Sequence, residues 1–131
     1  MADIKGLALD CRRLWAAKEA PDPNDGTWDL WILVDNALSS ASIGIPDYGQ
    51  MVGPIQHAVG VECVKHGWFP EWSLHPTYGW TFYAMEWDEG LKIGGDIQDF
   101  DGVTFLECAL VALKWFLENP MEDTDGKRLD G

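Results

Sequence analysis

Apolar side chains recur at helical spacing near the start of the chain and again near its middle. In residues 4–20 they are three or four positions apart, which places them on one face of a helix. Residues 53–66 show the same spacing, with Pro54 at the first helical position, where the missing backbone N–H does no harm. Gly67 favours the left-handed conformation that ends a helix. We therefore predict an amphipathic helix in each of these segments.

A third helix is predicted near the end of the sequence. Thr104 and Glu107 fit the capping box S/T-x-x-E, in which two side chains accept hydrogen bonds from backbone N–H groups at a helix start. The apolar stripe that follows consists of Leu106, Ala109, Leu110, Leu113, Phe116 and Leu117. Pro120 cannot continue a helix, so we expect the helix to end before it and the acidic residues 121–131 to form a flexible tail.

Between the second and third predicted helices the apolar period shortens to about two residues, the period of a β-strand. The three strand segments are residues 68–75, 80–87 and 91–97. Residues 80–87 carry large side chains on both faces, so we expect them to form the central strand, with at least partial cover on each face. The connections between the segments are short, which favours an antiparallel meander.

Residues 28–50 have a weaker pattern. Their apolar run is too short to separate a buried strand from a short buried helix, and the β-branched Ile32 and Val34 favour the strand slightly. Residues 38–50 are rich in Ser and Gly, and we expect them to be irregular. Together the elements predict one α+β domain over residues 1–120. In this domain a three-stranded antiparallel meander packs with helices in a layered α/β sandwich.

Residues 53–119 resemble small bacteriophage accessory proteins with an α-β-β-β-α sandwich. In those proteins a helix that ends in a glycine and an aromatic residue, here Gly67 and Trp68, leads into a Trp-rich meander. A closing helix of the type seen here as FLECALVALKWFLEN then follows. The resemblance implies a phage or prophage origin, and with it the host cytoplasm as the location. It implies no catalytic residue and no cofactor.

The charge balance narrows the class of partner. Nine Lys and Arg residues stand against 22 Asp and Glu residues, so the formal net charge at pH 7 is −13. Such a chain is poorly suited to bind nucleic acid or an anionic membrane directly, and it favours a basic partner. The sequence shows no secretory leader pattern and no apolar run of membrane-spanning length, so we expect a cytoplasmic protein. Its three cysteines are expected to be buried, reduced thiols.

Patterns for catalysis and metal binding are weak. His57, Glu62, Cys63 and His66 lie on one predicted helix and are all side chains that bind zinc in other proteins. Glu62 and His66 share a face, whereas His57 lies about two and a half turns from His66, on the opposite side. The sequence has no nucleophile elbow and no phosphate-binding glycine motif. We therefore expect no enzyme, metal or cofactor, and a small metal-dependent enzyme is the weakest alternative.

Carboxylates gather around the end of the predicted meander. Lys92 is the only cation among Glu86, Asp88, Glu89, Asp96, Asp99 and Asp101. We predict that these carboxylates form an acidic partner-binding face. Such a face imitates the polyanion DNA and occupies a protein groove built to bind it. An acidic surface that only keeps the protein soluble is the alternative.

The chain has eight tryptophans, more than a small sheet can bury. We predict that Trp72 and Trp87 are exposed anchors for a partner, because they lie on short strands close to turns. The resulting hypothesis is a non-enzymatic accessory protein that binds a basic, nucleic-acid-handling host protein and inhibits it as a DNA mimic. The alternative is a structural accessory protein that assembles into a homodimer or larger homo-oligomer through its aromatic patch.

Overall fold

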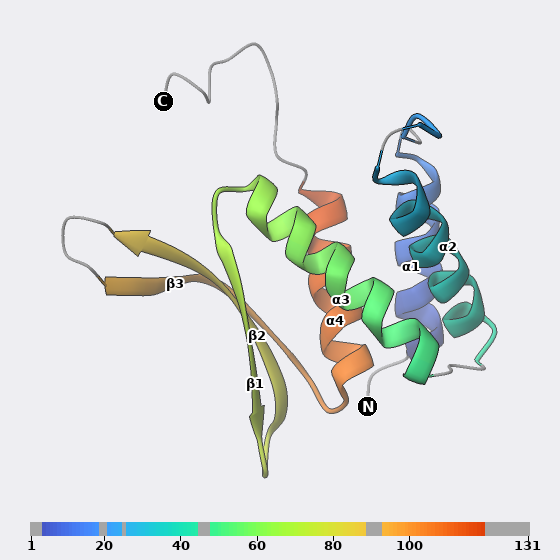
Figure 1. Cartoon of the computed structure of the whole chain (residues 1–131). Coiled ribbons are helices and arrows are strands. Elements are labelled where there is room, and N and C mark those ends of the chain that lie inside the picture. Colours follow the sequence, from blue (N-terminus) through green and yellow to red (C-terminus); the bar gives the residue numbers. More distant parts are fainter. Residues whose placement is uncertain (1–3, 19–20, 25, 45–47, 89–92, 120–131) are drawn as a thin grey trace.

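The part of the chain that the structure describes forms four helices and three strands, in the order α1-α2-α3-β1-β2-β3-α4 (Figure 1). The computed structural model describes residues 4–18, 21–24, 26–44, 48–88 and 93–119, and it describes their side chains except at 48–51, 87–88 and 93–97. The helices are α1 (Ile4–Ala16), α2 (Trp28–Ser42), α3 (Tyr48–Lys65) and α4 (Phe105–Glu118). The strands are β1 (Phe69–His75), β2 (Gly79–Asp88) and β3 (Ile93–Gly102). The predicted tail, residues 121–131, lies outside the described residues.

The elements form three layers (Figure 1). The sheet is one layer, and α3 and α4 cover one of its faces, with α3 against β1 and α4 against β2 and β3. Helices α1 and α2 form the third layer, in which α1 packs on α4 and α2 packs on α3. A helix between two layers must be apolar on both sides. Helix α4 meets this requirement, because seven of its 14 residues are buried, among them Leu110, Leu113 and Phe116.

Strand β2 is the central strand, as the sequence predicts, and it pairs with β1 and β3 in antiparallel register. Phe82 lies opposite Trp72 on β1 and opposite Phe100 on β3. The centroid of the Phe82 ring is 4.5 Å from that of Trp72 and 6.3 Å from that of Phe116 in α4. The core between sheet and helices is therefore built from aromatic rings, which bury large areas. The expected cover of both faces is wrong for the described elements, because the helices pack on one face only.

The layered α+β sandwich with a three-stranded antiparallel sheet is thus confirmed. None of the described helices is both long enough and apolar enough to cross a membrane.

Residues 28–42, for which the sequence pattern left strand and helix open in the first part and favoured irregular structure in the second, form a helix. Helix α2 buries Val34, Ala37, Leu38 and Ala41 between α1 and α3. These residues are three, four and seven positions apart, which is the helical period. The preference of Ile32 and other β-branched residues for strands is small, and tertiary packing outweighs it here. The slight preference for a strand at 28–37 and the expectation of irregular structure at 38–42 and 48–50 are therefore wrong.

Helix α3 begins at Tyr48, five residues before the predicted start. Pro54 therefore lies inside the helix, where it removes one backbone donor. Gly53 precedes it and has no Cβ, which relieves the usual steric conflict between proline and the side chain before it. The predicted end is confirmed, because Gly67 has a φ of 83° and its N–H donates to the carbonyl oxygen of Val64 at 2.9 Å.

The junction between β3 and α4 decides where two carboxylates lie. The backbone N–H of Glu107 donates to Oγ1 of Thr104 at 3.1 Å, which confirms the predicted cap. Strand β3, however, continues to Gly102, beyond the predicted end at residue 97, because its last residues pair with β2. Asp99 and Asp101 are therefore part of the sheet and not of a loop before the helix.

Candidate partner-binding surface

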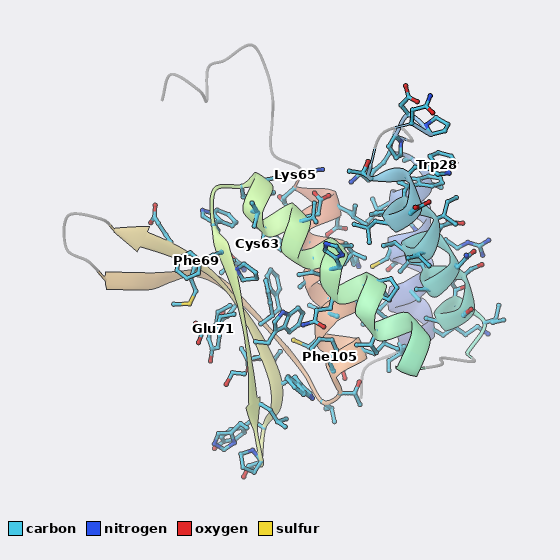
Figure 2. All side chains as sticks on the ribbon, in the orientation of Figure 1. Trp28, Cys63, Lys65, Phe69, Glu71 and Phe105 are labelled. Atoms are coloured by element: carbon cyan, nitrogen blue, oxygen red, sulfur yellow. The ribbon has the colours of Figure 1, made fainter. Side chains whose placement is uncertain are left out.

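The face of the sheet turned away from the helices carries two cross-strand rows of polar side chains. In one row Glu71, Tyr83 and Asp99 lie opposite one another, and in the next row Ser73, Thr81 and Asp101 do so. We call these six residues the open face. Figure 2 shows Glu71 on the side of the sheet away from Phe105, which belongs to α4. The polar rows lie on one side of the sheet and the helices on the other, because neighbouring residues of a strand point to opposite faces.

The open face is acidic. Glu71, Asp99 and Asp101 are exposed, and none of the side chains described on this face belongs to Lys or Arg. Oγ1 of Thr81 donates a hydrogen bond to Oδ1 of Asp101 at 2.9 Å, which holds one of the carboxylates in a defined position. Asp99 and Asp101 lie on the same side of β3, two residues apart, and their like charges repel one another, so the arrangement has a cost that a cationic partner would remove.

The six carboxylates predicted to form one face do not all lie together. Asp99 and Asp101 share the open face, whereas Glu86 follows the alternation of Phe82 and belongs to the opposite side of β2, where it is exposed. The backbones of Asp88 and Asp96 are in β2 and β3, but their side chains lie outside those described, and Glu89 lies outside the described residues.

Sequence reasoning missed Glu71 as a member of this face. The alternation of the predicted strand already indicates that Glu71, between the inward-facing Pro70 and Trp72, points outward. The sequence does not reveal the strand register, which sets Glu71 opposite Tyr83 and, through Tyr83, in line with Asp99.

Aromatic side chains are distributed differently from the prediction. Trp72 is not an exposed anchor, since it is partly buried and its ring centroid lies 4.6 Å from that of Phe105. The side chain of Trp87, in β2, lies outside those described. Tyr78, in the turn between β1 and β2, is 77% exposed, and its ring lies 4.5 Å from that of His75. An exposed aromatic ring is therefore found at the tip of the hairpin that carries four of the six residues of the open face.

The helix with the candidate metal ligands does not gather them. His57 is exposed and Cys63 is buried, and burial raises the pKa of the Cys63 thiol to about 11. The ring nitrogens of His66 lie 2.8 Å and 2.9 Å from the carbonyl oxygens of Glu62 and Asn119, so both are occupied by backbone contacts. Among the described residues no three His, Cys, Asp or Glu side chains are placed to hold one metal ion.

Comparison with known proteins supplies no template for this surface. No protein-family model matches the chain, and neither does any curated protein or solved structure with which it was compared. A function for this surface is therefore inferred from the chemistry of the chain's own side chains.

Proposed function

We propose that this chain is a non-enzymatic binding protein that docks its open face on a basic surface of a protein that handles nucleic acid. One observation carries the proposal: a sheet face without a covering helix presents three carboxylates, one from β1 and two from β3, and no cation among its described side chains. A face of this kind attracts surfaces rich in Lys and Arg and repels nucleic acid itself.

The geometry of the sheet makes the carboxylates a rigid array. Neighbouring strands are about 4.8 Å apart, so Glu71 and Asp99, with β2 between them, are separated by roughly 10 Å. Asp99 and Asp101 are two residues apart on β3, which is about 7 Å along the strand. A groove that binds a duplex presents cations to its regularly spaced phosphates. The open face thus has the charge and the rigidity that a mimic of DNA requires.

Tyr78 supplies an anchor beside the charges. Tyrosine is among the residues that contribute most to protein–protein affinity, because its ring buries a large area at a low entropic cost. Long-range attraction by a chain of net charge −13 accelerates encounter, and the aromatic contact slows dissociation.

The proposal is tested with two charge-matched variants. In the open-face variant Glu71→Gln, Asp99→Asn and Asp101→Asn are combined. In the control variant Asp22→Asn, in the α1–α2 connection, is combined with Asp35→Asn in α2 and Glu118→Gln in α4. Each change removes three negative charges, so both variants have a net charge of −10 instead of −13. Each chain, immobilised, is exposed to a bacterial lysate at low and at high salt, and the captured proteins are identified by mass spectrometry.

We expect the original chain and the control variant to capture nucleic-acid-binding proteins at low salt, and the open-face variant to lose them. Added duplex DNA should release the captured proteins, because both polyanions compete for one groove. If both variants lost captured proteins equally, net charge alone would explain the binding, and the open face would have no special role. Capture that neither salt nor DNA weakens would contradict the proposal.

Self-assembly, the alternative function, gains no support from the open face. Two copies that met through it would bring six carboxylates together, which is unfavourable. Light scattering at high protein concentration tests this alternative directly, and a stable dimer in low salt would favour it over binding to a basic partner.

A further inference from the structure

A cavity lies between the two helical layers, where α1, α2 and α3 meet. Its volume is about 180 Å³, and the lining is chiefly apolar, with Trp15, Leu30, Trp31, Ala58 and Val61. Figure 2 shows Trp28 at the start of α2 and Lys65 at the end of α3, towards the same end of the molecule. A cavity of about 150 Å³ is known to admit benzene. This one therefore has room for a molecule built on a single aromatic ring.

Tryptophan rings form one wall of the cavity. The rings of Trp15 and Trp31 are stacked, with centroids 6.3 Å apart and an interplanar angle of 28°. Trp28 extends the stack, with its ring centroid 5.5 Å from that of Trp31 and an interplanar angle of 14°. The stacked indoles make this wall aromatic, and aromatic guests pack favourably against aromatic rings, edge to face as well as face to face.

The same two rings hold hydrogen-bond donors without partners. Nε1 of Trp15 and Nε1 of Trp31 are both buried, and neither has a hydrogen-bond partner among the described residues. Trp15 as a whole is only 4% exposed, so water does not readily take the place of a partner. Neither nitrogen has appreciable accessible surface, so the two N–H groups do not open into the cavity and report on its wall rather than bind a guest.

The rim of the cavity carries an excess of positive charge. Nζ of Lys18 and Nζ of Lys65 lie 3.0 Å and 3.4 Å from the same oxygen, Oε2 of the buried Glu62. Among the described residues, the three charged side chains that line the cavity therefore sum to one positive charge, in a chain whose net charge is −13. Nζ of Lys18 also lies 4.9 Å from the centroid of the Trp15 ring, which places the charge beside the aromatic wall.

We propose that this cavity binds a small aromatic carboxylate, a molecule with one planar ring and one negative charge. The ring lies against Trp15 and Trp31, and the carboxylate pairs with Lys65 and Lys18 at the rim. The volume limits the guest to about one ring, the indole wall favours an aromatic one, and the excess positive charge selects an anion over a cation. This site is separate from the open face, which lies on the far side of α3 and α4.

Benzoate titrated into the ¹⁵N-labelled full chain tests the site, because each tryptophan contributes one indole N–H signal to the spectrum. The signals of Trp15 and Trp31, assigned through Trp15→Phe and Trp31→Phe, should shift in a saturable way. The Lys65→Met variant should bind benzoate at least about tenfold more weakly, since it removes a charged hydrogen bond. Glu62 keeps Lys18 as a partner in this variant, so the link between α3 and the segment after α1 is retained.

The Lys5→Met variant is the matched control, because Lys5 is exposed on α1 and does not line the cavity. It should bind benzoate as the original chain does. Benzylammonium, a cation of similar shape, is titrated into the original chain and should bind at least about tenfold more weakly than benzoate. The proposal is overturned if millimolar benzoate causes no saturable shift, if the shifts fall on other tryptophans, if the two lysine variants weaken binding equally, or if benzylammonium binds as well as benzoate.

Discussion

The two faces of the sheet come from the same three strands and differ in nearly every property. The covered face presents Trp72, Phe82 and Phe100 to the helices, and Phe82 is fully buried. The open face presents carboxylates and hydroxyl groups to solvent. Adjacent residues such as Phe82 and Tyr83 therefore have different tasks. Because a strand alternates its side chains, stability and surface chemistry are assigned to different positions and can be changed separately.

The largest difference between the faces is expected in stability. Phe82→Ala should lower the free energy of unfolding by about 3–5 kcal/mol, because it empties a site surrounded by the rings of Trp72, Phe100 and Phe116. Ser73→Ala, on the open face, should change it by less than about 0.5 kcal/mol. Urea denaturation followed by tryptophan fluorescence measures both. If both variants lost similar amounts of unfolding free energy, the covered face would not be the one that provides stability.

A second prediction concerns how tightly the covered face is packed. At Gly102 an added Cβ would collide with the backbone of Cys108 in α4, so Gly102→Ala should cost about 1–3 kcal/mol. At Gly60, in α3, an added Cβ would lie at an ordinary 3.9 Å from Cγ of Pro70. Gly60→Ala should therefore stabilise the protein by about 0.5–1 kcal/mol, because alanine is the better helix former. The melting temperatures of the two variants should move in opposite directions, and a shared direction would refute this account.

All three thiols belong to the helices behind the covered face, and they should make stability depend on alkaline pH. Burial raises the pKa of Cys11 and of Cys108 from 9.0 to about 12, and that of Cys63 from 9.0 to about 11. The folded state then holds protons that the unfolded state has lost, so the contribution of the thiols to the free energy of unfolding is constant below about pH 9 and falls as the pH rises towards 12.

Urea denaturation between pH 8 and 11 measures this slope, and a variant with alanine at all three positions should have a shallower one. At neutral pH the folded protein should react with a thiol reagent only after denaturant is added, since the thiolate is the reactive form. Rapid labelling of the folded chain would show that the thiols are not protected.

The smallest effect on stability is expected for the open face itself. Glu71→Gln with Asp99→Asn should change the free energy of unfolding by less than about 0.5 kcal/mol, because both side chains are exposed and lose only mutual repulsion. Denaturation curves in low and high salt measure the change, and salt should stabilise the original chain slightly more than the variant. A large loss of stability would show that these carboxylates have a structural task.

Prediction from sequence succeeded where the signal was local. The capping box at Thr104 and the helix stop at Gly67 depend on hydrogen bonds within one turn, and both are confirmed. Prediction failed at α2, although Val34, Ala37, Leu38 and Ala41 show the helical period. The short apolar run and two β-branched residues outweighed that period in the interpretation, whereas packing between α1 and α3 decides the structure.

The candidate sites were predicted in part. Asp99 and Asp101 were named from the sequence, and Trp72 was named for exposure that it does not have. Glu71 was missed because its place beside Asp99 depends on the register of three strands. The cavity was not foreseen, since Lys18 and Glu62 are 44 residues apart and meet only when α1 packs near α3.

The amino-acid sequence by itself determined the period of each helix and strand, the caps at their ends and the excess of negative charge. These properties depend on neighbours within a few residues or on composition alone. Only the tertiary structure decided which face of the sheet stayed uncovered, which carboxylates share it and where two lysines meet one buried glutamate. Those outcomes depend on strand register and helix packing, in which residues far apart in the chain compete for the same limited buried space.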